Sequence, residues 1–107
     1  MQEREEIIGE MVRRIVDRFS PERIILFGSH ARGTNDIDSD VDLLVVMHGP
    51  LSRRQQTVEI RKALADLPVG KDVIVVSPGY FERYRDIVGT VVWPAVREGR
   101  VLYERAA

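Results

Sequence analysis

Four aspartates lie close together in the middle of the chain, in the segment Asp36-Ile37-Asp38-Ser39-Asp40-Val41-Asp42. No basic residue occurs between Arg32 and Arg53, so the sequence gives these carboxylates no nearby cationic partner. Asp40 and Asp42 stand two apart at the start of an apolar run, so we expect both on one face of a strand. At about 5 Å and an effective dielectric near 20, their repulsion is roughly 3 kcal/mol, which is large for a small domain. A divalent cation would offset this repulsion.

The other residue types that could bind a metal limit which metal ion this chain could hold. The chain has no cysteine, which excludes disulfides, thiolate nucleophiles and cysteine-based zinc or iron–sulfur sites. It has two histidines, His30 and His48, too few for a three-histidine site. Oxygen ligands must therefore dominate, and these favour magnesium, manganese or calcium over zinc and copper.

Two other aspartate motifs fit this segment poorly. An EF-hand loop that begins at Asp36 requires Gly where Val41 stands and Glu where Met47 stands. A phosphatase with a nucleophilic Asp-x-Asp places its aspartates after an apolar strand, whereas here they precede one. We interpret Asp36 and Asp38 as turn-forming residues, a common use of aspartate.

A second candidate motif, Phe27-Gly28-Ser29-His30-Ala31-Arg32-Gly33, follows a short apolar run. Gly28 lets a ligand approach the backbone closely, Ser29 offers a hydroxyl, and the free N–H groups of a helix start favour an anion such as phosphate. Neither a Walker loop nor a Gly-x-Gly-x-x-Gly motif is present. Alone, this segment is also typical of a capped turn. Together with carboxylates on the next strand, it indicates a nucleotide held through its metal.

The elements that position these motifs alternate between helix and strand. Apolar periodicity, β-branched runs and capping signals predict them. In chain order we expect a helix over 7–19, a strand over 23–27, a turn with a short helical piece over 28–39, a strand over 41–47, a helix from Ser52 to about Pro68, a strand over 72–77, at most two short helices divided by Gly89 and Pro94, and a short closing strand over 101–103. This order predicts one α/β domain over residues 1–107.

Composition excludes several classes of protein. With 107 residues, 44% hydrophobic and 31% charged, the chain has the length and usage of one ordinary globular domain. Its 16 basic and 17 acidic residues give a net charge of −1, without the basic excess of a dedicated duplex-DNA binder. The longest apolar run, 43–47, is far too short to span a bilayer, and the acidic start does not fit a secretory signal. We therefore expect a cytoplasmic protein with no membrane partner.

The two motifs together resemble the signature of minimal nucleotidyltransferases in the DNA polymerase beta superfamily. The matching residues are Gly28-Ser29-His30-Ala31-Arg32-Gly33 and Ser39-Asp40-Val41-Asp42-Leu43-Leu44-Val45, with the family's spacing between them. The resemblance runs from about Ile24 to Ser77. It implies a palm-like α/β (α+β) fold with a small mixed sheet of three to four strands flanked by helices. His30 stands at a variable position of the family and receives no role from it.

The resemblance also implies roles for individual residues. Asp40 and Asp42 would hold two magnesium ions, or manganese, on the triphosphate of ATP. Asp72, which opens a later apolar run, matches the third carboxylate, which completes one metal site and helps deprotonate an acceptor hydroxyl. Gly28 and Ser29 would bind the terminal phosphates. Metal bridging and charge neutralisation are the main demands of phosphoryl transfer, so these roles agree with the chemistry.

Several alternatives stay open at this point. Asp72 could instead be a turn aspartate paired with Lys71 or a nearby arginine. Short proteins of this family resemble antitoxins paired with an all-helical HEPN ribonuclease toxin, which implies AMP transfer to a tyrosine of that toxin. A binding module that neutralises its partner by contact is a second hypothesis. A third is a small-molecule nucleotidyltransferase of the antibiotic-modifying kind, although those carry a further helical domain. The acceptor, the nucleotide preference and any homo- or hetero-oligomer are not determined by the sequence.

Overall fold

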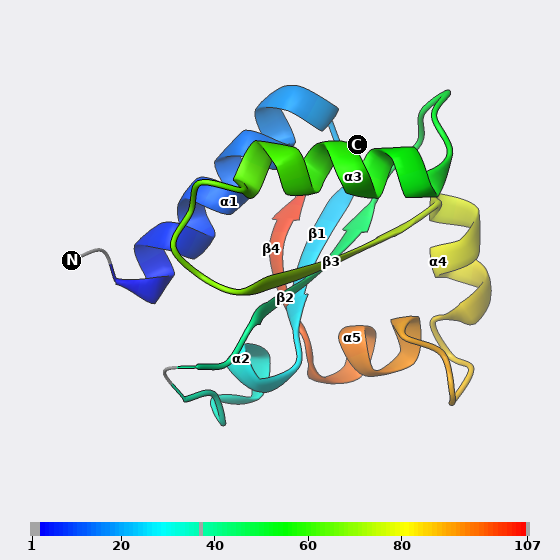
Figure 1. Ribbon diagram of the computed structural model, residues 1–107. Helices are drawn as coiled ribbons and strands as arrows, with labels where there is room; N and C mark the ends of the chain where they lie inside the picture. Colours follow the sequence, from blue (N-terminus) through cyan, green and yellow to red (C-terminus); the bar gives the residue numbers. More distant parts are fainter. Residues whose placement is uncertain (1–2, 37, 107) are drawn as a thin grey trace.

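A computed structural model describes residues 3–36 and 38–106 of the protein, and Figure 1 shows its elements. In chain order they are α1 (Arg4–Phe19), β1 (Arg23–Phe27), α2 (Ser29–Arg32), β2 (Val41–Val46), α3 (Arg53–Leu64), β3 (Lys71–Val76), α4 (Pro78–Tyr84), α5 (Val92–Glu98) and β4 (Arg100–Glu104). The strands form one sheet in the order β3-β2-β1-β4. β1 is antiparallel to β2 and to β4, whereas β2 and β3 are parallel. This confirms the predicted small mixed sheet flanked by helices.

Helices cover both faces of the sheet. Val41, Leu43 and Val45 of β2 pack in one apolar cluster with α1 and α3, and Leu44 and Val46 pack in a second cluster with α4 and α5. Figure 1 shows α1 and α3 next to each other and apart from α5. Because β2 is buried on both faces beyond Asp42, its sequence from Leu43 to Val46 is a continuous apolar run rather than an alternating one.

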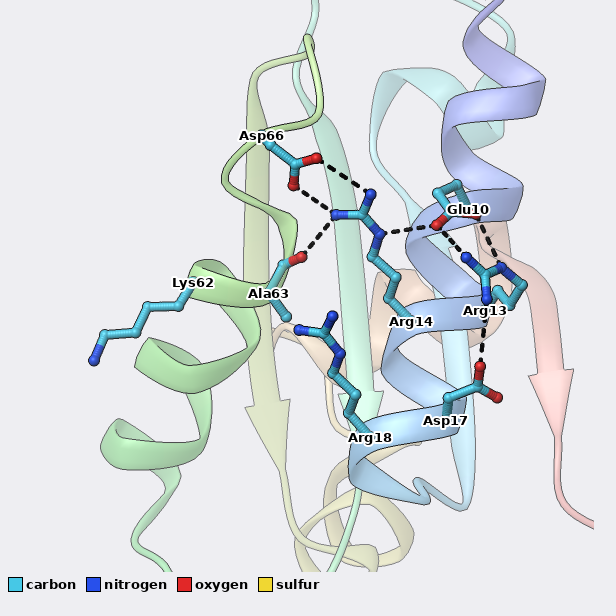
Figure 2. Close-up of a pocket in the computed structure, with 8 residues that line it drawn as sticks. All are labelled: Glu10, Arg13, Arg14, Asp17, Arg18, Lys62, Ala63 and Asp66. Atoms are coloured by element: carbon cyan, nitrogen blue, oxygen red, sulfur yellow. Dashed lines mark hydrogen bonds and ion pairs between the residues drawn. The ribbon is translucent and has the colours of Figure 1, made fainter.

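Polar side chains join α1 to the end of α3, in the region drawn in Figure 2. Arg14 of α1 donates to Asp66 Oδ1 at 2.6 Å and to the Ala63 carbonyl at 2.9 Å. Glu10 accepts hydrogen bonds from both Arg13 and Arg14, and these bonds lower the pKa of Glu10 to about 2. We interpret this network as a structural connection between two helices.

The helix ends lie where local sequence signals predict them, with two exceptions. The predicted capping box at Ser52 is present, with its side chain accepting from the backbone N–H three residues on. However, α3 ends at Leu64 and not near Pro68, because Leu67 N–H bonds back to the Leu64 carbonyl and starts a series of turns. Pro94 was expected to divide two helices, but it lies in the first turn of α5, where no helical N–H bond is lost. Within the described part of the chain, the helices are too short or too polar to cross a membrane.

Candidate active site

Three side chains form a row across one end of the sheet. Asp42 of β2 is paired in register with Phe27 of β1 and, on its other side, with Asp72 of β3. Paired residues of neighbouring strands project to the same face. Leu44, two residues after Asp42, packs against α4 and α5, so the row lies on the face that these helices cover. The register therefore brings Asp42 and Asp72 together, as the sequence predicted.

Gly28 makes room for the Asp42 carboxylate. A Cβ atom placed on Gly28 would lie closer to Asp42 Oδ2 than the 3.0 Å that real Cβ atoms keep. Gly28 also has a φ of 73°, which other residues adopt only with strain. The glycine of the predicted phosphate loop is thus required by both its backbone conformation and its contact with a carboxylate.

Gly70 does the same for Asp40. A Cβ atom on Gly70 would also come closer than 3.0 Å to Asp40 Oδ1. The Gly70 carbonyl accepts the N–H of Val41 at 2.9 Å, which fixes the start of β2 beside the loop that leads into β3. Gly70 was not among the residues expected in the site. Its position directly before the Lys71–Val76 strand is the signal that could have indicated it.

The electrostatics of the site are repulsive. The pKa of Asp42 is raised, first by its burial and then by the negative charges of Asp72 and Asp40, while His30 and Arg32 partly oppose the shift. Within residues 3–36 and 38–106, neither Asp40 nor Asp42 forms an ion pair. Two acceptor-only groups thus lie together without a cation to balance them.

Asp72 is paired with an arginine, one of the two kinds of partner considered from the sequence. Its Oδ1 accepts a hydrogen bond from Arg61 Nη2 of α3 at 3.2 Å, and both side chains are about half exposed, at 51% and 54%. Lys71, the neighbour considered from the sequence, donates instead to the Leu67 carbonyl at 3.2 Å. Asp72 therefore combines both interpretations, since it lies in register beside Asp42 and is paired with an arginine.

The remaining residues of the two motifs lie close by. Ser29 begins α2 directly after Gly28, and its hydroxyl makes no hydrogen bond to the described residues. The short helix α2 confirms the helical piece expected after Gly28. Asp36 Oδ1 accepts the Asp38 N–H at 2.9 Å and the Ser39 hydroxyl at 3.2 Å, so the first part of the acidic segment forms a turn as predicted.

The side chains of the site provide part of what a hard divalent cation needs. Asp40 and Asp42 offer unpaired carboxylate oxygens in a repulsive setting, and such oxygens suit magnesium or manganese. Over residues 3–36 and 38–106, however, no three Asp, Glu, His or Cys side chains are placed as a metal-binding group. In this conformation Asp72 is bonded to Arg61, so two carboxylates rather than three are available.

Comparison with known proteins identifies the family. A family model for the nucleotidyltransferase domain matches residues 8–93, which include both motifs and every site residue named above. The chain belongs to this nucleotidyltransferase family. The fold, the two motifs and the match agree on this family.

Solved structures with this fold support the same placement. A candidate nucleotidyltransferase from Sulfolobus solfataricus is 22% identical with a TM-score of 0.66, over 94% of this chain and 79% of that one. A toxin–antitoxin structure with AMP-PNP is 22% identical, with a TM-score of 0.57 over 96% and 75%. A Shewanella oneidensis complex of a tri-AMPylated HEPN toxin with an MNT antitoxin is 19% identical, with a TM-score of 0.53 over 94% and 72%. At these identities the likeness shows a shared fold. No curated protein matches this chain in sequence.

Proposed function

We propose that this nucleotidyltransferase is metal-dependent and transfers AMP from ATP to a tyrosine hydroxyl of a HEPN-type partner, for which it acts as the antitoxin. The observation that carries the proposal is the placement of Asp40 and Asp42 against two glycines, without a cationic partner and with Asp72 in register. The AMPylated HEPN toxin in one structure with the same fold supports this class of acceptor.

In this reaction the acceptor oxygen forms a bond to the α-phosphorus of ATP. The bond from that phosphorus to the oxygen bridging to the β-phosphate breaks, and pyrophosphate leaves with the electron pair. Asp40 and Asp42 would hold magnesium, which would supply neutralisation of the negative charge on the triphosphate. Asp72, on the exposed side of the row, would accept the proton of the attacking hydroxyl once it leaves Arg61.

The Gly28–Ser29 segment would hold the terminal phosphates. Gly28 has no side chain between its backbone and the Asp42 carboxylate. The Ser29 hydroxyl, which makes no hydrogen bond to the described residues, would donate to a phosphate oxygen. A phosphate bound there would lie beside the carboxylates that hold its metal. The Gly28–Ser29 segment and the acidic row, by which we mean Asp40, Asp42 and Asp72, thus form one site for a metal–nucleotide complex.

The alternative is a non-catalytic module that neutralises its partner by contact. The observation that favours it is the Arg61–Asp72 ion pair, which occupies the third carboxylate. In that case the ion pair would persist in the complex, and the carboxylates would have no catalytic task. The substitution Asp72→Asn separates the two functions.

The test uses the protein co-purified with its partner, incubated with ATP and magnesium, and mass spectrometry of the partner. We expect AMP on a partner tyrosine with the wild type, and a rate about 10²–10⁴-fold lower with Asp72→Asn, while the complex still forms. Asp66→Asn is the matched control, because Asp66 is also an exposed aspartate bonded to an arginine. If the wild type neutralises its partner without added mass, and Asp72→Asn does so equally well, the binding module is the correct function.

A further inference from the structure

His30 is the one side chain near the site whose polar atoms are buried without a partner in the described part of the chain. Both ring nitrogens, Nδ1 and Nε2, are shielded from solvent and make no hydrogen bond. A neutral imidazole has one donor and one acceptor, and leaving both unpaired in the interior is unfavourable. An orphaned group of this kind in a native structure needs an explanation, and a hydrogen-bond partner within the site is one.

The position of His30 indicates which group could relieve it. His30 is the second residue of α2, directly after Ser29 and two residues from Gly28, whose backbone lies against the Asp42 carboxylate. A charged His30 would act on Asp42 from this position, since its charge lowers the pKa of that carboxyl. His48, by contrast, is 72% exposed and lies 3.4 Å from Glu22, away from the acidic row.

We propose that His30 is a positioning residue for Asp42, and that in the metal-loaded protein a ring N–H of His30 donates to the Asp42 carboxylate. The proposal rests on the proposed function, because it requires that Asp42 holds a divalent cation. Carboxylates that bind metals are usually themselves hydrogen-bonded, and such outer partners orient them. Among the described residues Asp42 has no hydrogen-bond partner, and the His30 ring nitrogens are unpaired, whereas the Arg32 guanidinium pairs with Glu98.

A hydrogen-bond partner inside the protein accounts for the buried nitrogens of His30 better than a phosphate ligand does. Both nitrogens are closed to solvent, so a ligand that enters from outside would first have to displace the side chain. The Asp42 carboxylate lies against the backbone of Gly28, directly before α2, so an acceptor for a His30 N–H is available inside the site. A direct contact between His30 and the nucleotide is the rival outcome of the test.

The first experiment measures Mn²⁺ affinity by electron paramagnetic resonance, without nucleotide and then with α,β-methylene ATP. His30→Leu fills similar space without polar atoms, and we expect it to weaken Mn²⁺ binding about 10-fold or more even without nucleotide. Either His30→Gln or His30→Asn, which place an N–H near Nε2 or Nδ1, should recover part of the loss. His48→Leu is the matched control and should bind as the wild type does.

The second experiment follows the histidine signals of the wild-type protein, and a variant serves only to assign them. The chain has two histidines, so the ring signals in an NMR spectrum are few, and the His30→Gln spectrum assigns them. On addition of Mg²⁺ with α,β-methylene ATP, the His30 signal should move and the His48 signal should not. The melting temperature of metal-free His30→Leu should equal or exceed that of the wild type, because the variant removes two buried unpaired nitrogens.

The outcomes separate the proposals. Wild-type Mn²⁺ affinity in His30→Leu, or a His30 signal that does not move, would overturn the role of His30 and leave the proposed function intact. A loss confined to the nucleotide would make His30 a phosphate contact and would also overturn it. A wild-type protein that binds neither Mn²⁺ nor its nucleotide complex would contradict the proposed function itself.

Discussion

Asp42→Asn tests the repulsive site most directly, because it removes one charge and keeps the shape of the side chain. The pKa of Asp42 is raised by burial and by the charges of Asp72 and Asp40. A folded pKa above the unfolded value means that the ionised form weakens the fold at neutral pH. This penalty disappears as the pH falls through the raised pKa. We therefore expect Asp42→Asn to stabilise the protein in the absence of metal.

The size of the effect follows from the register. Asp42 and Asp72 are paired on neighbouring strands, which lie about 5 Å apart. Two charges at that distance repel by roughly 3 kcal/mol at an effective dielectric of 20, and solvent at the half-exposed Asp72 lowers this to about 1 kcal/mol. For a domain of this size, about 1 kcal/mol raises the melting temperature by roughly 4 °C.

With magnesium and ATP, the wild type should melt at a higher temperature than Asp42→Asn. At 100 times the dissociation constant, a ligand stabilises the wild type by about 2.7 kcal/mol, or roughly 10 °C. Asp42→Asn should lose most of that increment, so the two proteins exchange order between the two conditions. Differential scanning calorimetry at pH 7 measures both conditions.

Asp38→Asn is the control for this experiment, because Asp38 is an exposed carboxylate in the same segment but lies in the turn. It should change neither the melting temperature of the ligand-free protein nor the increment. An Asp42→Asn protein that melts lower without metal would refute the electrostatic reasoning. One that keeps the full increment with magnesium and ATP would refute the metal role of Asp42.

Three further predictions use other parts of the chain. Gly28→Ala should lower both stability and magnesium–ATP affinity. Gly33 has a φ of 74° and open space around it, so Gly33→Ala should cost about 1 kcal/mol of stability and leave that affinity unchanged. Urea unfolding and calorimetric titration compare the two variants, and equal affinities would contradict the fit of Asp42 to Gly28. The pKa of Glu10 is lowered to about 2 by hydrogen bonds from two arginines, so its stabilisation is present above about pH 4.5 and is lost as the pH falls toward 2. Glu10→Gln should therefore flatten the melting temperature between these pH values, and an unchanged slope would argue against the network. Ser52→Ala removes the cap of α3 and should cost about 1 kcal/mol in urea unfolding, while no change would show that α3 is held by packing alone.

The elements that the sequence predicted well are those whose signals are local. β-branched apolar runs located all four strands within about a residue or two, and the serine caps located the starts of α3 and α4. The end of α3 was placed too late, because the choice between one more helical turn and the turn at Leu67 depends on how the chain must reach β3. That requirement comes from the sheet and is not written in the local residues.

The parts of the site that depend on distant residues were not predictable in the same way. The pairing of Asp72 with Arg61 and the contact of Gly70 with Asp40 join segments from different elements. Long side chains such as arginine reach many positions, so their partners follow only from the packed fold. The row of Asp42 and Asp72 was anticipated through the family resemblance, and the strand register gives its physical basis.

The unfavourable features of this protein gather at one end of the sheet, and that distribution bears on its function. The pKa of Asp42 is raised by burial and by the charges of Asp72 and Asp40, and Gly28 has a left-handed backbone with a carboxylate against it. Both ring nitrogens of His30 are shielded without a hydrogen-bond partner in the described part of the chain. Each of these features is unfavourable for the fold, and such conflicts are typical of functional sites. A surface that only docks a partner has no need of clustered like charges, because contact uses complementary groups. The concentration of these costs around the acidic row therefore favours a catalytic metal–nucleotide site over a passive binding module.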